Sequence, residues 1–324
     1  MVVKKIINKF YLPIILVLAI IFFAITTDAF FSVHNLTNIF VQNSYLVVAT
    51  MGIAIVMIAG GADLSVSWQM GLVSVICGML LQNNAIPVPL IIFIGILLGG
   101  SLGLFNGLIT IKLKVHPMVA TLATMTIFQG IAYVLCGGST FFNFPDSFKA
   151  IGQKYLFGWL PMSVIIMFVM YAIAYVILKK MYFGRHIYSL GGNEEAARMA
   201  GLNTKFIRVA SFVLSGVFIA IAAMVLTART GTASPGIASD AVFICISACV
   251  LGGISFNGGE GNITNMFISV MLLGIISNGM QLMGLSIYSQ YIMKGTILAL
   301  AIAFDNYQKK SHQIELANQA KTAR

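Results

Sequence analysis

Long apolar runs, separated by short polar segments, recur along almost the whole chain. Most runs are roughly 17 to 23 residues long, which is enough for a helix to cross about 30 Å of hydrocarbon. The pattern therefore predicts an all-α, polytopic membrane protein with about ten transmembrane helices. The predicted spans lie near residues 11–27, 43–60, 68–83, 88–110, 117–136, 161–180, 207–228, 240–253, 263–282 and 288–306.

Two of these spans carry signs of a break inside the membrane. The span 240–253 is short for a full crossing, and the span 43–60 ends in a glycine pair. Irregular backbone is tolerated at membrane depth only where it is buried in protein or lines a wet cavity. We therefore expect broken or re-entrant segments at both places.

The two glycine-rich stretches GGADLSVS, from residue 60, and GGISFNGG, from residue 252, each follow an apolar run. Matching Gly60-Gly61 to Gly252-Gly253 predicts a weak internal repeat of a span and its exit turn. Paired glycines allow positive φ and close approach to a neighbouring helix. In the first stretch, Asp63 is expected to cap the next helix, which leaves Ser65 and Ser67 as hydroxyl donors. The alternative is two turns with no role in binding.

The composition excludes an ordinary soluble domain. Hydrophobic residues make up 59% of the chain and charged residues 9%, and the mean hydropathy is +0.96. We predict one transmembrane domain over residues 1–310, followed by a polar cytoplasmic tail over 311–324. The four cysteines lie in or beside apolar spans and show no metal-ligand spacing, so no disulfide framework and no metal site are expected.

The net charge of +10 reflects membrane topology rather than nucleic-acid binding. With the N-terminus in the cytoplasm, the cytoplasmic segments hold fifteen of the 19 lysines and arginines, and the external side holds only Lys149, Lys154 and Arg229. This distribution agrees with the positive-inside rule and predicts that both termini are cytoplasmic. No basic surface is long enough to follow a phosphate backbone, so no nucleic-acid partner is expected.

One long polar stretch interrupts the apolar pattern, at residues 184–203 within a cytoplasmic loop that extends to 206. Asn193 is placed to cap a helix, Glu194 and Glu195 lie where the helix dipole favours anions, and Gly201 is placed to end the helix. Ala196 and Ala197, with Met199 and Ala200, offer a small apolar surface. The stretch is suited to docking on a soluble partner, and the alternative is a surface connector that binds nothing.

Polar residues inside the spans need a partner or a path of water. As candidate residues of a translocation path or gate we select Asn43, Gly60, Gly61, Asp63, Ser65, Asn106, Gln129, Gly252, Gly253, Asn278 and Gln281. For each amide, hydrogen bonding between helices is the competing interpretation. Lys294 lies inside the last span, and Asp240, at the start of the span 240–253, is its best partner for a structural ion pair.

The chain offers no catalytic constellation. No Ser/His/Asp or Cys/His set can be assembled, because the four histidines lie in loops or at span ends. No Gly-x-x-x-x-Gly-Lys-Ser/Thr phosphate loop occurs either, so the chain is not expected to bind ATP. We therefore predict a protein that is not an enzyme and holds no cofactor of its own.

Several motifs resemble the ribose-type sugar permeases of bacterial ABC importers. Glu195-Ala196-Ala197 followed by Gly201 resembles the EAA-x-x-x-G loop of such permeases, and GGADLSVS resembles their GG-x-DLS-x-G signature. The blocks VLGGISFNGGEG and NGMQLMGLSIYSQYIMKG also match, and the resemblance runs from about Phe31 to Asp305. The chain departs from the pattern at Ser67, where glycine is usual, and at Ser239, where an acidic residue is usual.

The resemblance implies a permease subunit that imports a monosaccharide, ribose-like, through a bacterial inner membrane. It implies four partners: a cytoplasmic ABC ATPase that holds ATP and Mg, an extracytoplasmic sugar-binding protein, a second copy or paralogue of the permease, and membrane lipid. The implied ATPase-coupling residues are Gly184, Arg185, Asn193, Glu194, Glu195, Ala196, Ala197 and Gly201.

Other substrates and another energy source remain open at this point. An ABC permease for a nucleoside, an autoinducer-type furanose or a branched-chain amino acid would share the same architecture. An ion-coupled secondary carrier working alone is a rival of a different class. Such a carrier needs an acidic relay within the spans, whereas the acidic residues here lie at span ends.

Overall fold

The computed structural model describes residues 2–82, 86–300 and 303, and these are mostly helical. The helices are α1 (Val2–Thr26), α2 (Val33–Ile58), α3 (Val66–Gln82), α4 (Val88–Lys112), α5 (Pro117–Cys136), α6 (Asp146–Gln153), α7 (Met162–Lys179), α8 (Tyr182–Gly192), α9 (Glu194–Met199), α10 (Thr204–Thr230), α11 (Ala241–Leu251) and α12 (Ile263–Leu282). Residues 287–300 are also helical. Two short antiparallel pairs join β1 (Phe141–Phe142) to β4 (Thr232–Ala233) and β2 (Tyr155–Leu156) to β3 (Leu160–Pro161). The all-α prediction is confirmed, and the predicted tail 311–324 lies outside the described residues.

The helices agree with a protein that crosses the membrane several times. Among the described residues, six helices are long and apolar enough to span a bilayer, namely α2, α4, α5, α7, α10 and α12. Shorter apolar helices cover Leu12–Thr26, Val66–Gln82 and Ala241–Leu251. Val66–Gln82 follows the irregular residues 61–65 after the glycine pair, and Ala241–Leu251 has 11 residues, fewer than a full crossing needs. Re-entrant segments at these two places stay a prediction. The total of ten spans stays a prediction.

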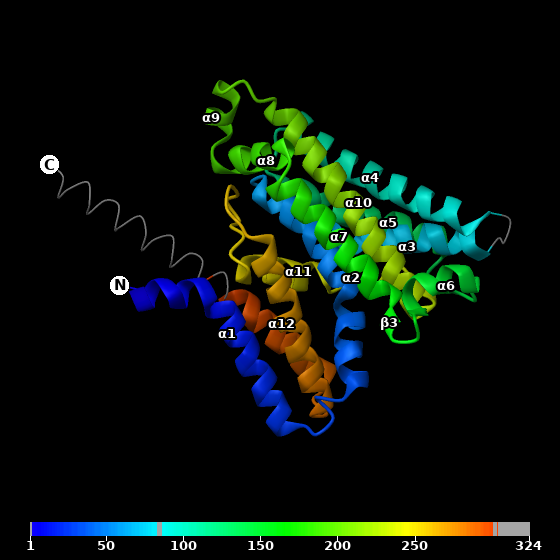
Figure 1. The fold of residues 1–324 in the computed structure, drawn as a ribbon. Coiled ribbons are helices and arrows are strands. Elements are labelled where there is room, and N and C mark those ends of the chain that lie inside the picture. Colours follow the sequence, from blue (N-terminus) through cyan, green and yellow to red (C-terminus); the bar gives the residue numbers. More distant parts are fainter. Residues whose placement is uncertain (1, 83–85, 301–302, 304–324) are drawn as a thin grey trace.

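Two helices, α2 and α10, form the centre of the bundle (Figure 1). In the most apolar stretch of α2 and of α10, 78% and 67% of the residues are buried inside the protein, against 22% in α4. Glycines let α4 lie directly on α10, because a β-carbon at Gly99 or Gly103 would overlap the carbonyl oxygens of Gly216 and Phe212. Such close approach through small residues is typical of helix packing in membranes.

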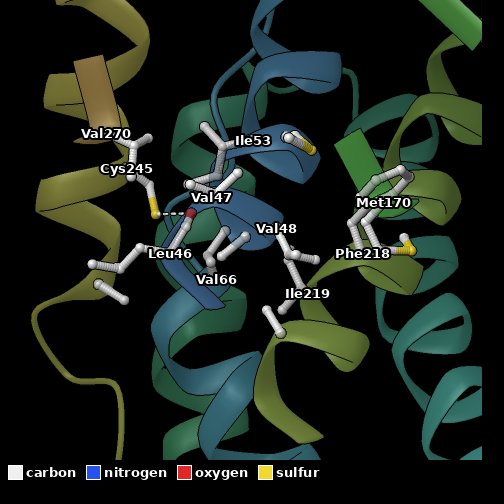
Figure 2. Close-up of a cluster of buried hydrophobic side chains, with 14 of the residues drawn as sticks. Leu46, Val47, Val48, Ile53, Val66, Met170, Phe218, Ile219, Cys245 and Val270 are labelled. Atoms are coloured by element: carbon white, nitrogen blue, oxygen red, sulfur yellow. Dashed lines mark hydrogen bonds between the residues drawn. The ribbon is translucent and has the colours of Figure 1, made fainter. Parts of the chain in front are cut away.

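The buried core joins α2 to the helices around it. Figure 2 shows Leu46 and Val47 of α2 beside Cys245 of α11, and Phe218 of α10 beside Met170 of α7. The Cys245 thiol donates to the Leu46 carbonyl oxygen at 3.9 Å, which ties α11 to α2 at this level. Because α2 touches α7, α10, α11 and α12, a movement of α2 must affect all of them.

Residues 231–240, which precede α11, run as a largely irregular segment beside α3. A β-carbon at Gly78 would lie 2.6 Å from that of Ala233, and one at Gly71 would overlap the Pro235 carbonyl oxygen. Ser67 Oγ then accepts a hydrogen bond of 3.0 Å from the Val242 amide. Helix α11 therefore begins beside the first turn of α3.

The two glycine turns share their geometry, but the predicted register of the repeat is wrong by one residue. Gly60 has φ +82° and Gly253 has φ +78°, whereas Gly61 and Gly252 lie outside the left-handed region. In both turns the positive-φ glycine and the residue after it donate to carbonyl oxygens of the preceding helix. Gly60 therefore corresponds to Gly253, and Gly61 corresponds to Ile254. Gly61 is small for another reason, since a β-carbon there would lie 2.9 Å from Pro117.

Candidate functional site

A polar cavity of about 420 Å³ lies between α2, α11, α12 and the helical residues 287–300. The last turn of α10 and the residue before α11 complete its wall. Its lining consists of Asn38, Val41, Gln42, Asn43, Tyr45, Leu46, Arg229, Asp240, Ile244, Ser247, Leu273, Gly274, Ser277, Gln281, Gln290 and Lys294. Of the predicted path residues, only Asn43 and Gln281 are among them, together with both members of the predicted ion pair.

Charged groups in the cavity are held by one another and by aromatic rings. Lys294 Nζ lies 3.2 Å from Asp240 Oδ2, and their side chains are 19% and 40% exposed. The Arg229 guanidinium lies 5.3 Å from the ring centroid of Tyr45, and its Nη1 donates to the Val41 carbonyl oxygen at 3.4 Å. Among the described residues no carboxylate lies within ion-pair distance of Arg229. The cavity therefore carries two cationic side chains and one anionic one.

The uncharged lining is rich in amides and hydroxyls. Each amide carries both donors and acceptors, so a solute with hydroxyl groups on several sides finds partners without burying a net charge. The Asn43 amide donates within α2 to the Ile39 carbonyl oxygen at 2.7 Å. Gln281 faces the cavity from the last turn of α12. The arrangement is suited to transient hydrogen bonding of a polar solute.

The remaining predicted amides on α12 and α5 lie outside the cavity lining. Asn278 lies three residues before Gln281, yet it exchanges two hydrogen bonds of 3.0 and 2.8 Å with Asn35 of α2, where both are buried. Gln129 is on α5, away from the cavity lining. Helix-to-helix bonding, the competing interpretation in the sequence, is what the structure shows for Asn278.

Asp63 anchors a buried polar network at the start of α3. Its carboxylate accepts a hydrogen bond of 2.9 Å from the amide of Ser65, which precedes α3. It also accepts one of 3.0 Å from Nε2 of Gln69, which is on the first turn of α3. Asn106 of α4 donates to Ser65 Oγ at 2.8 Å. Three predicted path residues, Asp63, Ser65 and Asn106, therefore lie together in one network, but this network is outside the cavity. It attaches the turn between α2 and α3 to α4. The Ser65 hydroxyl is a donor, as the sequence predicts, and it donates to Asp63 within this network.

The polar stretch 184–203 forms two helices, α8 and α9, that meet at Asn193. The Asn193 side chain accepts from the Ala196 amide at 2.9 Å and so caps α9, as predicted. Gly201 follows the end of α9 with φ +84°, and the Leu202 amide donates back to the Ala197 carbonyl oxygen at 3.1 Å. The predicted helix stop at Gly201 is confirmed.

Only part of this stretch faces outward. Met199 is 84% exposed, and Glu195 and Ala196 lie on the surface, whereas Ala197 is 4% exposed and packs inward. Gly184 is also buried, since a β-carbon there would overlap the carbonyl oxygens of α7's last turn. The predicted apolar surface therefore consists of Ala196, Met199 and Ala200 without Ala197.

One ion pair holds α9 on the bundle, and two further side-chain contacts lie within α9 and α8 themselves. Glu194 Oε2 lies 2.6 Å from Arg208 Nη2 on α10, which holds the start of α9 on the bundle. Glu195 pairs with Arg198 at 3.5 Å on the surface. The Arg185 guanidinium stacks 4.2 Å from the ring centroid of Tyr182. The small helix α9 thus sits on a defined support and presents one face.

The described residues form a helical bundle with several apolar spans and a cavity lined by amides, hydroxyls and charged groups. The chain matches the family model described as branched-chain amino acid transport system / permease component over residues 35–302. The chain belongs to this family, and it is a permease component and not an enzyme.

Curated relatives cover nearly the whole chain. The ribose import permease protein of Haemophilus influenzae is 34% identical over 304 residues, which is 93% of each chain. The galactose/methyl galactoside import permease protein of Escherichia coli is 35% identical over 91% of this chain and 93% of its own. The D-allose transport system permease protein of the same bacterium is 31% identical over 92% of this chain and 91% of its own. No solved structure was found to match the chain.

Proposed function

We propose that this chain imports a monosaccharide as the membrane-spanning subunit of a binding-protein-dependent ABC importer. The observation that carries the proposal is its similarity, over more than nine-tenths of its length, to permeases named for ribose and galactose import. The cavity supports it, because amide and hydroxyl groups suit a neutral polyhydroxylated solute. The solute passes along this cavity, and a second permease copy or a paralogue completes the path.

A cytoplasmic ATPase docks on α9 and the exposed side of α8 in this proposal. The small face formed by Ala196, Met199 and Ala200 gives it an apolar contact, and Glu195 and Arg198 give it charged ones. ATP and Mg are held by that partner. A sugar-binding protein delivers the solute from outside. The chain has ten spans in a bacterial inner membrane, with both termini cytoplasmic.

A branched-chain amino acid is the second candidate, because the family description names it and the cavity contains charges of both signs. A zwitterion needs a cation and an anion that are free to bind it. Lys294 and Asp240 are instead paired with each other. The relatives described above are also named for sugars, so the monosaccharide is the better supported solute.

Cysteine labelling tests the docking face and its orientation. The native cysteines at 77, 136, 245 and 249 are all buried, so little background reaction is expected. In intact cells, a cysteine at Asn193 is expected to resist a membrane-impermeant maleimide, and one at Asp146, whose side chain is 98% exposed, to react. In inverted vesicles the pattern reverses, and bound ATPase protects the cysteine at Asn193. Labelling of that cysteine from outside intact cells contradicts the proposed topology and the docking face together.

A further inference from the structure

The end of α8 touches two other segments of the chain by backbone alone. A β-carbon built at Gly191 would overlap the Ile58 carbonyl oxygen, at the end of α2, and the Gly259 amide nitrogen. Gly259 donates a hydrogen bond of 2.9 Å to the same Ile58 oxygen. The end of α2, the end of α8 and the connector 252–262 therefore meet at one point. Figure 1 shows the yellow connector reaching up to α8.

Further glycines make this meeting point tight. A β-carbon at Gly258 would lie 2.5 Å from the Cα of Gly60, and one at Gly259 would lie 2.5 Å from the Cα of Gly192. Both connector glycines have positive φ, at +84° and +74°. Backbone contacts of this kind contain no flexible side chain that can absorb a displacement. We call the contact of Gly191 with Ile58 and Gly259 the glycine joint.

A side-chain hydrogen bond reinforces the glycine joint one turn earlier on α8. Tyr188 Oη donates to the Gly261 carbonyl oxygen at 3.0 Å. The Tyr188 phenol is protonated at neutral pH, and burial raises its pKa further. The ammonium of Lys179 lies 5.3 Å from the ring centroid of Tyr188 and gives it a further contact. Helix α8 thus holds the connector at two successive levels.

The glycine joint contacts segments that are continuous with the helices that line the cavity. The connector 252–262 lies between α11 and α12, and α2 ends at Ile58. These three helices contribute Leu46, Ile244 and Leu273, among others, to the cavity lining. A displacement of α8 therefore acts on α2 by direct contact and on α11 and α12 through the connector. A contiguous chain of packed contacts of this kind can carry energetic coupling between two sites.

We propose that the glycine joint transmits the movement of the ATPase-docking helices to the cavity, with Gly191 as a positioning residue for transport. This inference rests on the proposed function, since it assumes that an ATPase moves α8 and α9. It assigns the transmission to one backbone contact and not to α9's salt bridge with α10.

The chain offers a matched pair of variants on one helix. Gly191→Ala places a methyl group against the Ile58 oxygen, whereas Gly192→Ala meets no atom nearer than 4.0 Å. With the ATPase and the sugar-binding protein present, Gly191→Ala is expected to lower the sugar taken up per ATP hydrolysed by about tenfold, through a shifted conformational equilibrium. Gly192→Ala is expected to match the wild type. ATPase co-purification with the permease should be equal in all three proteins.

A third variant keeps the test decisive if Gly191→Ala fails to fold. Tyr188→Phe removes the hydrogen bond to Gly261 without adding bulk, and a loss of about two- to threefold in the same ratio is expected, of the order of one lost hydrogen bond. Normal transport per ATP in a folded Gly191→Ala protein overturns the inference. So does a normal ratio in Tyr188→Phe when Gly191→Ala is absent from the membrane. Failure of the wild-type permease to bind any ATPase would refute the proposed function instead, which separates the two.

Discussion

Replacing Gly201 by valine is expected to abolish ATP-driven uptake, although the permease should still reach the membrane in normal amounts. Gly201 has φ +84°, and a β-carbon at this position would meet no atom within 4 Å, so the cost arises from the backbone and not from crowding. A side chain in the left-handed region costs about 1–2 kcal/mol, and a β-branched one more. The chain then leaves this conformation, α9 loses its stop, and its exposed face moves away from the ATPase. Co-purification of the ATPase measures the loss.

Gly201→Asn is the matched control for this prediction. Asparagine tolerates the left-handed conformation better than other side chains, and space for it is available. It should therefore keep most ATPase binding and uptake, while Gly201→Val keeps neither. Wild-type ATPase co-purification in Gly201→Val would show that the position of α9 does not matter for docking.

Replacing Asp240 by leucine is expected to have an effect of similar size on uptake. Lys294, whose side chain is 19% exposed, would then lack its counter-charge within the bundle. Loss of the partner costs about 1–3 kcal/mol, less than for a fully buried pair because water reaches Asp240. Lys294 is expected to reorient and close the cavity wall between α11 and residues 287–300. Uptake, membrane level and thermal stability of the purified permease together measure the effect.

Double variants separate a structural pair from a solute-binding one. In Asp240→Leu/Lys294→Met both charges are gone, so stability is expected to return close to that of the wild type. Uptake should recover with it if the pair only holds the wall. A stable double variant that transports nothing would contradict the structural role and indicate that one of the two charges contacts the solute.

Local features of the sequence predict local features of the structure well. The Asn193 cap and the Gly201 stop depend only on a few neighbouring residues, and both are present. The shortness of α11 is also visible in the sequence, because the apolar run 240–253 is too short for a full crossing. The all-α membrane architecture likewise depends on hydrophobicity alone.

Features that depend on contacts between distant segments could not be predicted from the sequence. Asn278 is satisfied by Asn35, more than two hundred residues away, and no pattern along α12 indicates this. Paired glycines suggest one register for the repeat, but the turns are defined by positive φ, which Gly60 and Gly253 adopt. In the sequence, Arg229 looks like an external loop charge. Its role in the cavity depends on Tyr45, whose ring it covers from another helix.

We propose that this permease moves a monosaccharide at the expense of ATP hydrolysed by a partner. The most direct measurement is uptake of labelled sugar into proteoliposomes that contain the permease and its ATPase, with the sugar-binding protein added on the opposite side from ATP. Sugar is expected to accumulate only when ATP, the ATPase and the loaded binding protein are all present. Sugar accumulation by the permease alone, driven by a proton or sodium gradient, would contradict it.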